Sequence, residues 1–246
     1  MKKQILLSIA ILISFCASAQ FKATITYRST TKLQIDIQGA SEADMTNIPK
    51  EHSTNKVLYI NDGKSMYLNV KEEPKPADTD GGDGPHIIIK TDAPDEKIYC
   101  DLNTKSRIEQ REFMDRLFLI TSDLSSQKWK LTGRQKQILN YPCQEAELID
   151  STRRISVWFS SSLQASTGPN GLGNLPGVIL EANFNDGEVV VVAANIDTVN
   201  VDSSVFVVPT KGKKMTKAEY NAMVEEKMKE MDNENGGNNV IIKIKK

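Results

Sequence analysis

The sequence predicts a mainly β protein built on an antiparallel sheet, with one helix near the C-terminus. Short runs in which polar and apolar residues alternate recur along most of the 246 residues, and a period of two is typical of half-buried strands. Two Asn-Asp-Gly turns, at 61–63 and 185–187, separate consecutive runs as in hairpins. No long helical segments lie between the runs, which favours antiparallel pairing over parallel strand–helix–strand units.

The expected strands occupy a β domain that spans residues 20–210. One segment interrupts their rhythm: residues 72–96 are rich in Pro, Gly and Asp and predict a long exposed acidic loop. The expected strands, in order, are 22–27, 32–38, 56–60, 64–70, 97–102, 116–121, 128–132, 144–149, 153–160, 177–184, 188–195 and 198–208.

The C-terminal part, residues 211–246, predicts a helix and a short apolar tail. Thr216 and Glu219 have the spacing of a capping box, so the helix is expected to begin there and to run to about Met231. The tail at 239–246 alternates polar and apolar residues and is expected to be an edge strand or a free tail.

Residues 1–19 predict a secretory signal peptide. Lys2 and Lys3 precede an apolar run at 5–15, and Ala17-Ser18-Ala19 is a small-residue cleavage site. We therefore expect export to the periplasm or to the outer membrane. A lipid anchor at Cys16 is the alternative, although the bulky Phe15 before it disfavours that reading. The apolar run is too short to span a bilayer, and no transmembrane span is expected in the mature chain.

Charge and cysteine content narrow the function classes further. The chain carries 31 Lys and Arg against 32 Asp and Glu, so there is no electrostatic case for a nucleic-acid partner. Removal of the signal peptide leaves two cysteines, Cys100 and Cys143, in an oxidising compartment, where an even pair predicts a disulfide. Two buried free thiols are the alternative.

The sequence contains no recognisable catalytic or metal-binding motif. The two histidines, His52 and His86, lie far apart in the sequence, and no zinc, nucleotide or nucleophile-elbow motif occurs. The acidic run 78–84 departs from the calcium-loop order because Gly82 stands where an oxygen ligand is needed. We therefore expect no cofactor, no metal and no enzymatic activity. A hydrolase that uses carboxylates stays open because Asp and Glu are plentiful.

Turn-forming residues concentrate in the run 168–177, directly before the apolar strand at 178–180. Gly168, Pro169, Leu175, Pro176 and Gly177 mark it as a shaped loop that leads into a buried strand. Trp129 and Trp158 lie on neighbouring strand-like runs. Both are expected either to pack in the sheet or to line a ligand cleft.

Four short sequence blocks between about Lys128 and Glu181 resemble the GLPGLI family of exported Gram-negative envelope proteins. The resemblance runs from about Lys128 to Glu181 through Lys-Trp-Lys-Leu at 128–131, Tyr-Pro-Cys at 141–143, Trp-Phe at 158–159 and Leu-Pro-Gly-Val-Ile-Leu-Glu at 175–181. It departs from the family hexapeptide at Asn174, which replaces Gly, and at Val178, which replaces Leu.

The resemblance implies one strongly curved antiparallel sheet, a half-barrel similar to the lipoprotein-carrier type, with the helix on its concave side. It implies a non-enzymatic binding or carrier module for an apolar ligand or an outer-membrane protein partner. A structural protein that docks through its C-terminal helix and strand is the alternative. The candidate ligand-binding residues are Trp158, Trp129, Leu175 and Pro176.

Overall fold

The computed structural model describes residues 21–36, 50–70, 96–150, 153–199, 201–234 and 241–243. The expected signal peptide 1–19 with Cys16, the acidic loop 72–96 except its last residue, and most of the C-terminal tail lie outside these residues.

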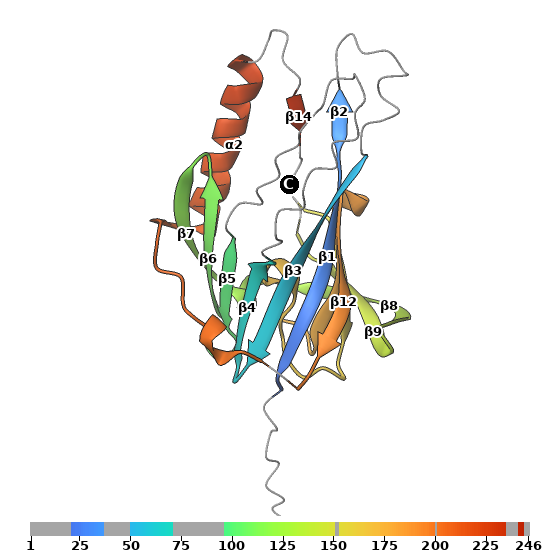
Figure 1. The fold of residues 1–246 in the computed structure, drawn as a ribbon. Helices are drawn as coiled ribbons and strands as arrows, with labels where there is room; N and C mark the ends of the chain where they lie inside the picture. Colours follow the sequence, from blue (N-terminus) through green and yellow to red (C-terminus); the bar gives the residue numbers. More distant parts are fainter. Residues whose placement is uncertain are drawn as a thin grey trace, which may run out of the picture.

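One sheet of twelve strands dominates the described part of the chain, and it does not close into a barrel (Figure 1). The strands are β1 (Ala23–Lys32), β3 (Glu51–Asn61), β4 (Lys64–Asn69), β5 (Lys97–Asp101), β6 (Ser106–Phe113), β7 (Arg116–Asp123), β8 (Trp129–Ile138), β9 (Tyr141–Leu148), β10 (Ile155–Ser160), β11 (Val178–Phe184), β12 (Val189–Asp197) and β13 (Lys213–Thr216). Their spatial order is β13-β7-β6-β5-β4-β3-β1-β12-β11-β10-β9-β8. A separate pair joins β2 (Gln34–Asp36) to β14 (Ile241–Lys243).

The sheet and the helix confirm the expected fold class. All neighbouring strands of the large sheet pair antiparallel except β13 and β7, which run parallel. The alternation in β1 buries Ala23, Ile25 and Tyr27 completely, as a period of two requires. In the hairpin between β3 and β4, Asp62 and Gly63 have φ of 50° and 69°, as the Asp-Gly signal predicts.

The strand expectations are wrong in three places. Residues 106–113 form β6 and residues 213–216 form β13, although no strand was expected at either position. The run 198–208 has no strand among its described residues and instead contains a 3₁₀ turn, η4 (Ser203–Val205). Its apolar side chains do not pack into the sheet, since Val199 and Val207 are 79% and 71% exposed. Strand β12 before it already has β1 and β11 as neighbours, so the later run finds no strand edge beside it.

The long connection between β10 and β11 lies on the concave side of the sheet. It contains the short turn η2 (Pro169–Gly171), which lies against β4, β5 and β11. A segment that contacts both halves of a curved sheet must lie inside the curve. The loop is correspondingly buried, and Leu172 and Leu175 belong to a core cluster with Val157, Phe159 and Ile179. We call residues 163–177 the inner loop.

Helix α2 (Lys217–Glu234) follows β13 directly. The expected capping box is present: the Glu219 carboxylate accepts from the Thr216 backbone N–H at 2.7 Å, and the Thr216 hydroxyl accepts from the Glu219 N–H at 3.2 Å. Tyr220 packs against Phe118 and Ile120 of β7, so the helix covers one edge of the sheet (Figure 1). Among the described helices, none combines the length and the apolar character needed to cross a membrane.

The expected disulfide is not formed. Cys100 on β5 and Cys143 on β9 are both buried free thiols. These strands are not neighbours in the sheet order, and each thiol has its own polar partner. Cys143 Sγ donates to the carbonyl of Tyr141 at 3.4 Å, and the Ser65 hydroxyl interacts with Cys100. Both cysteines therefore pack as small apolar side chains in the main core cluster.

Candidate functional site

Strand β6 carries a row of charged side chains on its inner face. Arg107, Glu109 and Arg111 alternate along the strand and therefore point to the same side of the sheet. The Glu109 side chain lies deepest, with 1% exposed, and forms ion pairs with Arg107, whose Nε lies 3.1 Å from Oε1, and with Arg111, whose Nη2 lies 3.4 Å from Oε2. Lys217, the first residue of α2, is its third cation, with Nζ 3.1 Å from Oε2. The helix is thus tied to the centre of β6 through a buried carboxylate.

A second carboxylate extends the row toward β3. Arg111 Nη2 also pairs with Glu96, just before β5, and Glu96 accepts from Lys56 Nζ of β3 at 2.9 Å. One guanidinium nitrogen therefore joins two carboxylates. The side chains of Glu96 and Lys56 are only 13% and 15% exposed, so this part of the row is also mostly buried. We call Lys56, Glu96, Arg107, Glu109, Arg111 and Lys217 the ionic cluster.

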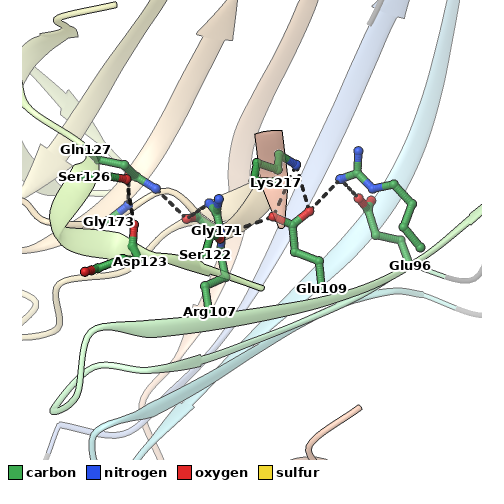
Figure 2. Close-up of polar contacts among 11 residues, drawn as sticks. Glu96, Arg107, Glu109, Ser122, Asp123, Ser126, Gln127, Gly171, Gly173 and Lys217 are labelled. Atoms are coloured by element: carbon green, nitrogen blue, oxygen red, sulfur yellow. Dashed lines mark hydrogen bonds and ion pairs between the residues drawn. The ribbon is translucent and has the colours of Figure 1, made fainter. Parts of the chain in front are cut away.

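The ionic cluster continues into the inner loop. Arg107 Nη1 donates to the Gly171 carbonyl at 2.8 Å, and Arg107 Nε donates to the Ser122 hydroxyl at 2.8 Å. Gln127 Nε2 donates to the same Gly171 carbonyl at 3.0 Å, and Gln127 Oε1 accepts from Gly173 N at 2.8 Å. Figure 2 shows these contacts as one chain that runs from Gln127 through Gly171 and Arg107 to Glu109, Lys217 and Glu96. The inner loop and α2 are therefore held by the same polar network.

Positive charge is in excess within the ionic cluster, which has four cations and two carboxylates. Burial lowers the pKa of Lys217, the pairing with Glu109 opposes that shift, and the nearby Arg111 and Arg107 lower the pKa further. For Arg111, burial alone would lower the pKa, but Glu96 and Glu109 outweigh it and raise the pKa. The neighbouring positive charges therefore help to lower the pKa of Lys217, whereas Glu96 and Glu109 hold Arg111 in its charged form.

Two tyrosines border the ionic cluster. The Tyr220 ring lies within 6.0 Å of the Arg111 guanidinium carbon and 5.8 Å of Lys217 Nζ, measured to the ring centroid. Tyr67 on β4 lies on the other side, with Lys56 Nζ 5.4 Å from its ring centroid. Burial raises the pKa of Tyr67 well above its ordinary value, and the charge of Glu96 raises it further. The Tyr67 hydroxyl is buried and makes no hydrogen bond within the described chain.

The sequence candidates for ligand binding lie elsewhere and do not form one group. Leu175 and Pro176 line a half-open hollow of about 330 Å³, together with Leu102, Lys105, Leu124, Ser166 and Asn174. Trp129 holds the inner loop, because its indole N–H donates to the Gly173 carbonyl at 2.8 Å. Trp158 packs against the main core cluster, with Lys136 Nζ 4.3 Å from its ring centroid. A ligand-binding role for these four residues stays a prediction.

The motif residues of the inner loop allow its close approach to the sheet. Gly177 has φ of +156°, and a Cβ there would lie 2.1 Å from the Ser160 carbonyl oxygen. At Gly168, a Cβ would lie 2.5 Å from the Ile179 side chain. Pro169 begins the turn η2, and its preset φ suits that position. The expectation of a shaped loop is therefore met by backbone positions that a larger residue cannot occupy without displacement.

Sequence reasoning missed the ionic cluster. A row of charges with a period of two is typical of a solvent-exposed strand face, so Arg107, Glu109 and Arg111 gave no sign of burial. The available signal was the alternation of both signs on a strand-length segment between two expected strands. Among the described residues, no group of three or more His, Cys, Asp or Glu side chains is arranged to hold a metal ion.

The fold is similar to two crystal structures of PNGF-II, in space groups C2 and P2₁. The first is 20% identical with a TM-score of 0.53 over 85% of this chain, and the second is 18% identical with a TM-score of 0.54 over 84%. This chain spans about a third of the length of either, 33% in both cases. At this level of identity the likeness establishes the fold alone. A search of curated proteins finds no match.

A family model described as "N-glycanase peptide, N-terminal domain" matches residues 88–221, which is more than half of the chain. The match overturns the resemblance to the GLPGLI family, whose quoted blocks all lie inside the matched segment. The match also corrects the expected function: because the matched family is the N-terminal domain of an N-glycanase, the expectations of a non-enzymatic carrier, of a structural docking protein and of no link to an enzyme are wrong. The chain belongs to the N-glycanase N-terminal domain family.

Proposed function

We propose that this chain works in the removal of N-linked glycans from glycoproteins and that its ionic cluster engages the substrate. The observation that carries the proposal is the family match at residues 88–221, which contains five of the six residues of the ionic cluster. Only Lys56 lies outside the matched segment. The polar centre of the fold and the family assignment therefore fall on the same part of the chain.

The chemistry of the ionic cluster suits a hydrated, oxygen-rich substrate. Guanidinium and ammonium groups donate to sugar hydroxyls and to carbonyl oxygens, and carboxylates accept from hydroxyl groups. Arg111 and Lys217 lie at the more exposed side, with 19% and 26% of their side chains accessible. A substrate group that approaches from this side meets donors from both β6 and α2.

Hydrolysis by this chain itself is a second candidate, which the pair Glu96 and Glu109 favours. Hydrolysis of an amide-type linkage needs a group that takes a proton from water and donors that stabilise the oxygen on which charge develops. The two carboxylates share one nitrogen of Arg111, so acceptors and donors lie side by side.

A glycan-release assay tests the proposal. The full chain is incubated with a glycoprotein that carries neutral, high-mannose N-glycans, and released glycans are labelled and quantified. Binding of a glycopeptide from the same glycoprotein is measured in parallel. We expect binding, with release if the chain also hydrolyses the linkage. Arg111→Gln should weaken the interaction, whereas Arg154→Gln, at an arginine that is 81% exposed and pairs with Asp186, should not. Failure to bind or process the glycoprotein would contradict the proposal.

A further inference from the structure

We infer that the ionic cluster is a binding site for an oxyanion, a carboxylate or phosphate group, carried by an acidic sugar of the glycan. The anion site is argued from the charges and donors of the cluster. The identification of the ligand as an acidic sugar rests on the proposed function.

The charge balance of the ionic cluster is the first observation. Within the described residues, Lys56, Arg107, Arg111 and Lys217 each pair with Glu96 or Glu109, so four positive charges share two carboxylates and the six side chains carry a net charge of +2. The most exposed of these six side chains, Lys217, is 26% accessible. A net positive charge on a mostly buried cluster destabilises the folded protein. A bound oxyanion would balance this charge and stabilise the cluster.

Two buried donors supply the second observation. Arg111 Nε and the Tyr67 hydroxyl are both inaccessible to solvent and make no hydrogen bond within the described chain. Tyr67 itself is only 2% exposed. Buried donors in folded proteins are almost always paired, so two unpaired donors beside an excess of positive charge indicate a place for an acceptor.

The geometry of the donors favours an oxyanion over a neutral sugar hydroxyl. The planar fork of a guanidinium matches the paired oxygens of carboxylate and phosphate groups. Arg111 already contacts one oxygen of each of two carboxylates, Glu96 and Glu109. An oxyanion bound beside Arg111 would also meet Lys217 of α2, because Arg111 Nη2 and Lys217 Nζ lie 3.4 Å and 3.1 Å from the same oxygen, Glu109 Oε2.

Ligand titration of the full chain tests this site. The probes are N-acetylneuraminic acid as a sugar carboxylate, mannose 6-phosphate as a sugar phosphate, inorganic phosphate, and mannose as the neutral control. Affinities are measured by calorimetry, and melting temperatures are recorded with each probe. We expect at least one of the two acidic sugars to bind more tightly than both mannose and inorganic phosphate. Equal binding of mannose would overturn the anion site, and equal binding of inorganic phosphate would show an adventitious ion only.

Variants place the bound anion in the structure. Lys217→Met should weaken binding of the acidic sugar by about tenfold or more, since a hydrogen bond to a charged group is lost. Lys229→Met is the matched control on the same helix, where Lys229 is 71% exposed and pairs with Glu225. Unchanged affinity in Lys217→Met would place the anion elsewhere and overturn the proposal.

Tyr67→Phe separates ligand binding from folding. Its hydroxyl has no hydrogen bond to lose within the described chain, so the ligand-free protein should melt at the same temperature or higher. Affinity for the acidic sugar should still fall by about tenfold. An unchanged affinity would overturn the assignment of Tyr67 to the site. Because the assay for the proposed function uses neutral glycans, glycan processing without anion binding would refute this inference alone.

Discussion

Glu109 is the residue on which the polar centre of the protein depends. Its carboxylate is 1% exposed and contacts three cations that come from two elements, β6 and α2. A buried carboxylate is stable only when nearby cations and hydrogen-bond donors balance its charge. The three cations stabilise Glu109 in this way, and Glu109 in turn stabilises the three partly buried cations. Removal of this one charge leaves Arg107, Arg111 and Lys217 with a single remaining carboxylate, Glu96, in the ionic cluster.

We expect Glu109→Gln to lower the free energy of unfolding by about 3 kcal/mol, in the range for breaking a buried ion pair. Urea denaturation followed by fluorescence measures the change. Glu147→Gln is the matched control on a sheet strand, because Glu147 is 49% exposed and lies 4.0 Å from Arg134. Its effect should stay below about 0.5 kcal/mol. Equal effects of the two variants would show that Glu109 does not organise the cluster.

Among the elements, the inner loop and α2 define the interior of the curved sheet. The loop fills the concave side through backbone positions that only glycine can occupy, and α2 covers the edge at β7 through Tyr220. Both elements meet at β6, the loop through Arg107 and the helix through Glu109.

Gly177→Ala should destabilise the protein by at least about 2 kcal/mol, because the new Cβ has no room and the φ is unfavourable for alanine. The clash is with backbone, at 2.1 Å from the Ser160 carbonyl oxygen, so it cannot be relieved by a side-chain rotation. Gly133→Ala tests φ alone, since Gly133 has φ of +82° and no atom within 4 Å of a new Cβ. Its cost should be about 1 kcal/mol. Thermal melts of both variants compare the two effects, and similar shifts would contradict the close packing of the loop.

Tyr220→Ala should release α2 from the sheet. Its ring packs edge-on against Phe118, with the centroids 5.5 Å apart, and is 5% exposed. Loss of a buried aromatic ring costs about 3 kcal/mol, and here the loss falls on one element. Hydrogen exchange in residues 217–231 should therefore become faster, while exchange in β1 and β3 stays unchanged. Met228→Ala serves as the control, since Met228 is 40% exposed. Unchanged protection of the helix in Tyr220→Ala would show that other contacts hold it.

The elements also show where sequence reasoning succeeded. The strands expected at 64–70 and 177–184 are present as β4 and β11, because their apolar periodicity reflects burial of one or both faces, and the capping box predicts the start of α2. Strand β6 was missed because its inner face is charged, and the hydrophobic pattern carries no signal for a face that is buried through ion pairs. The ionic cluster was missed for the same reason, since its members come from four separate segments that only the fold brings together.

On the scale of the whole molecule, the two cysteines belong to one continuous interior rather than to a covalent link. Cys100 is 2% exposed and Cys143 is 1% exposed, and both pack in the core cluster that also contains Ile25, Leu58 and Leu180. The even cysteine count alone favoured a disulfide, and the count carries no information on whether strands β5 and β9 are neighbours. The division into 1–19, 20–210 and 211–246 stays a prediction.

Stability should fall at alkaline pH. Burial raises the pKa of Cys100 from 9.0 to about 11. Between these values the unfolded chain releases the thiol proton while the folded chain retains it, so ionisation favours unfolding as the pH rises. The buried Cys100 thiol contributes about 2 to 3 kcal/mol to the free energy of unfolding. This contribution is fully present below pH 9 and is lost by about pH 11. Burial also raises the pKa of Tyr27 and Tyr67, which adds to the fall in the same direction above pH 10.

Urea titrations from pH 8 to pH 11 measure this dependence. Cys100→Ala should flatten the profile between pH 9 and pH 10, where the tyrosines contribute little. An identical profile in the variant would show that the thiol is accessible in the folded protein.

The position of β1 in the sheet has a consequence for synthesis. The first described strand to leave the ribosome lies near the centre of the sheet, between β3 and β12. Its register on one side joins Thr24–Thr31 to residues 189–197, near the end of the β domain. Until those residues emerge, the nascent chain carries an open, apolar strand edge, which is prone to pair with other chains. Fragments that end before residue 189 should therefore aggregate, and the order of translation favours a factor that shields β1 until β12 is complete.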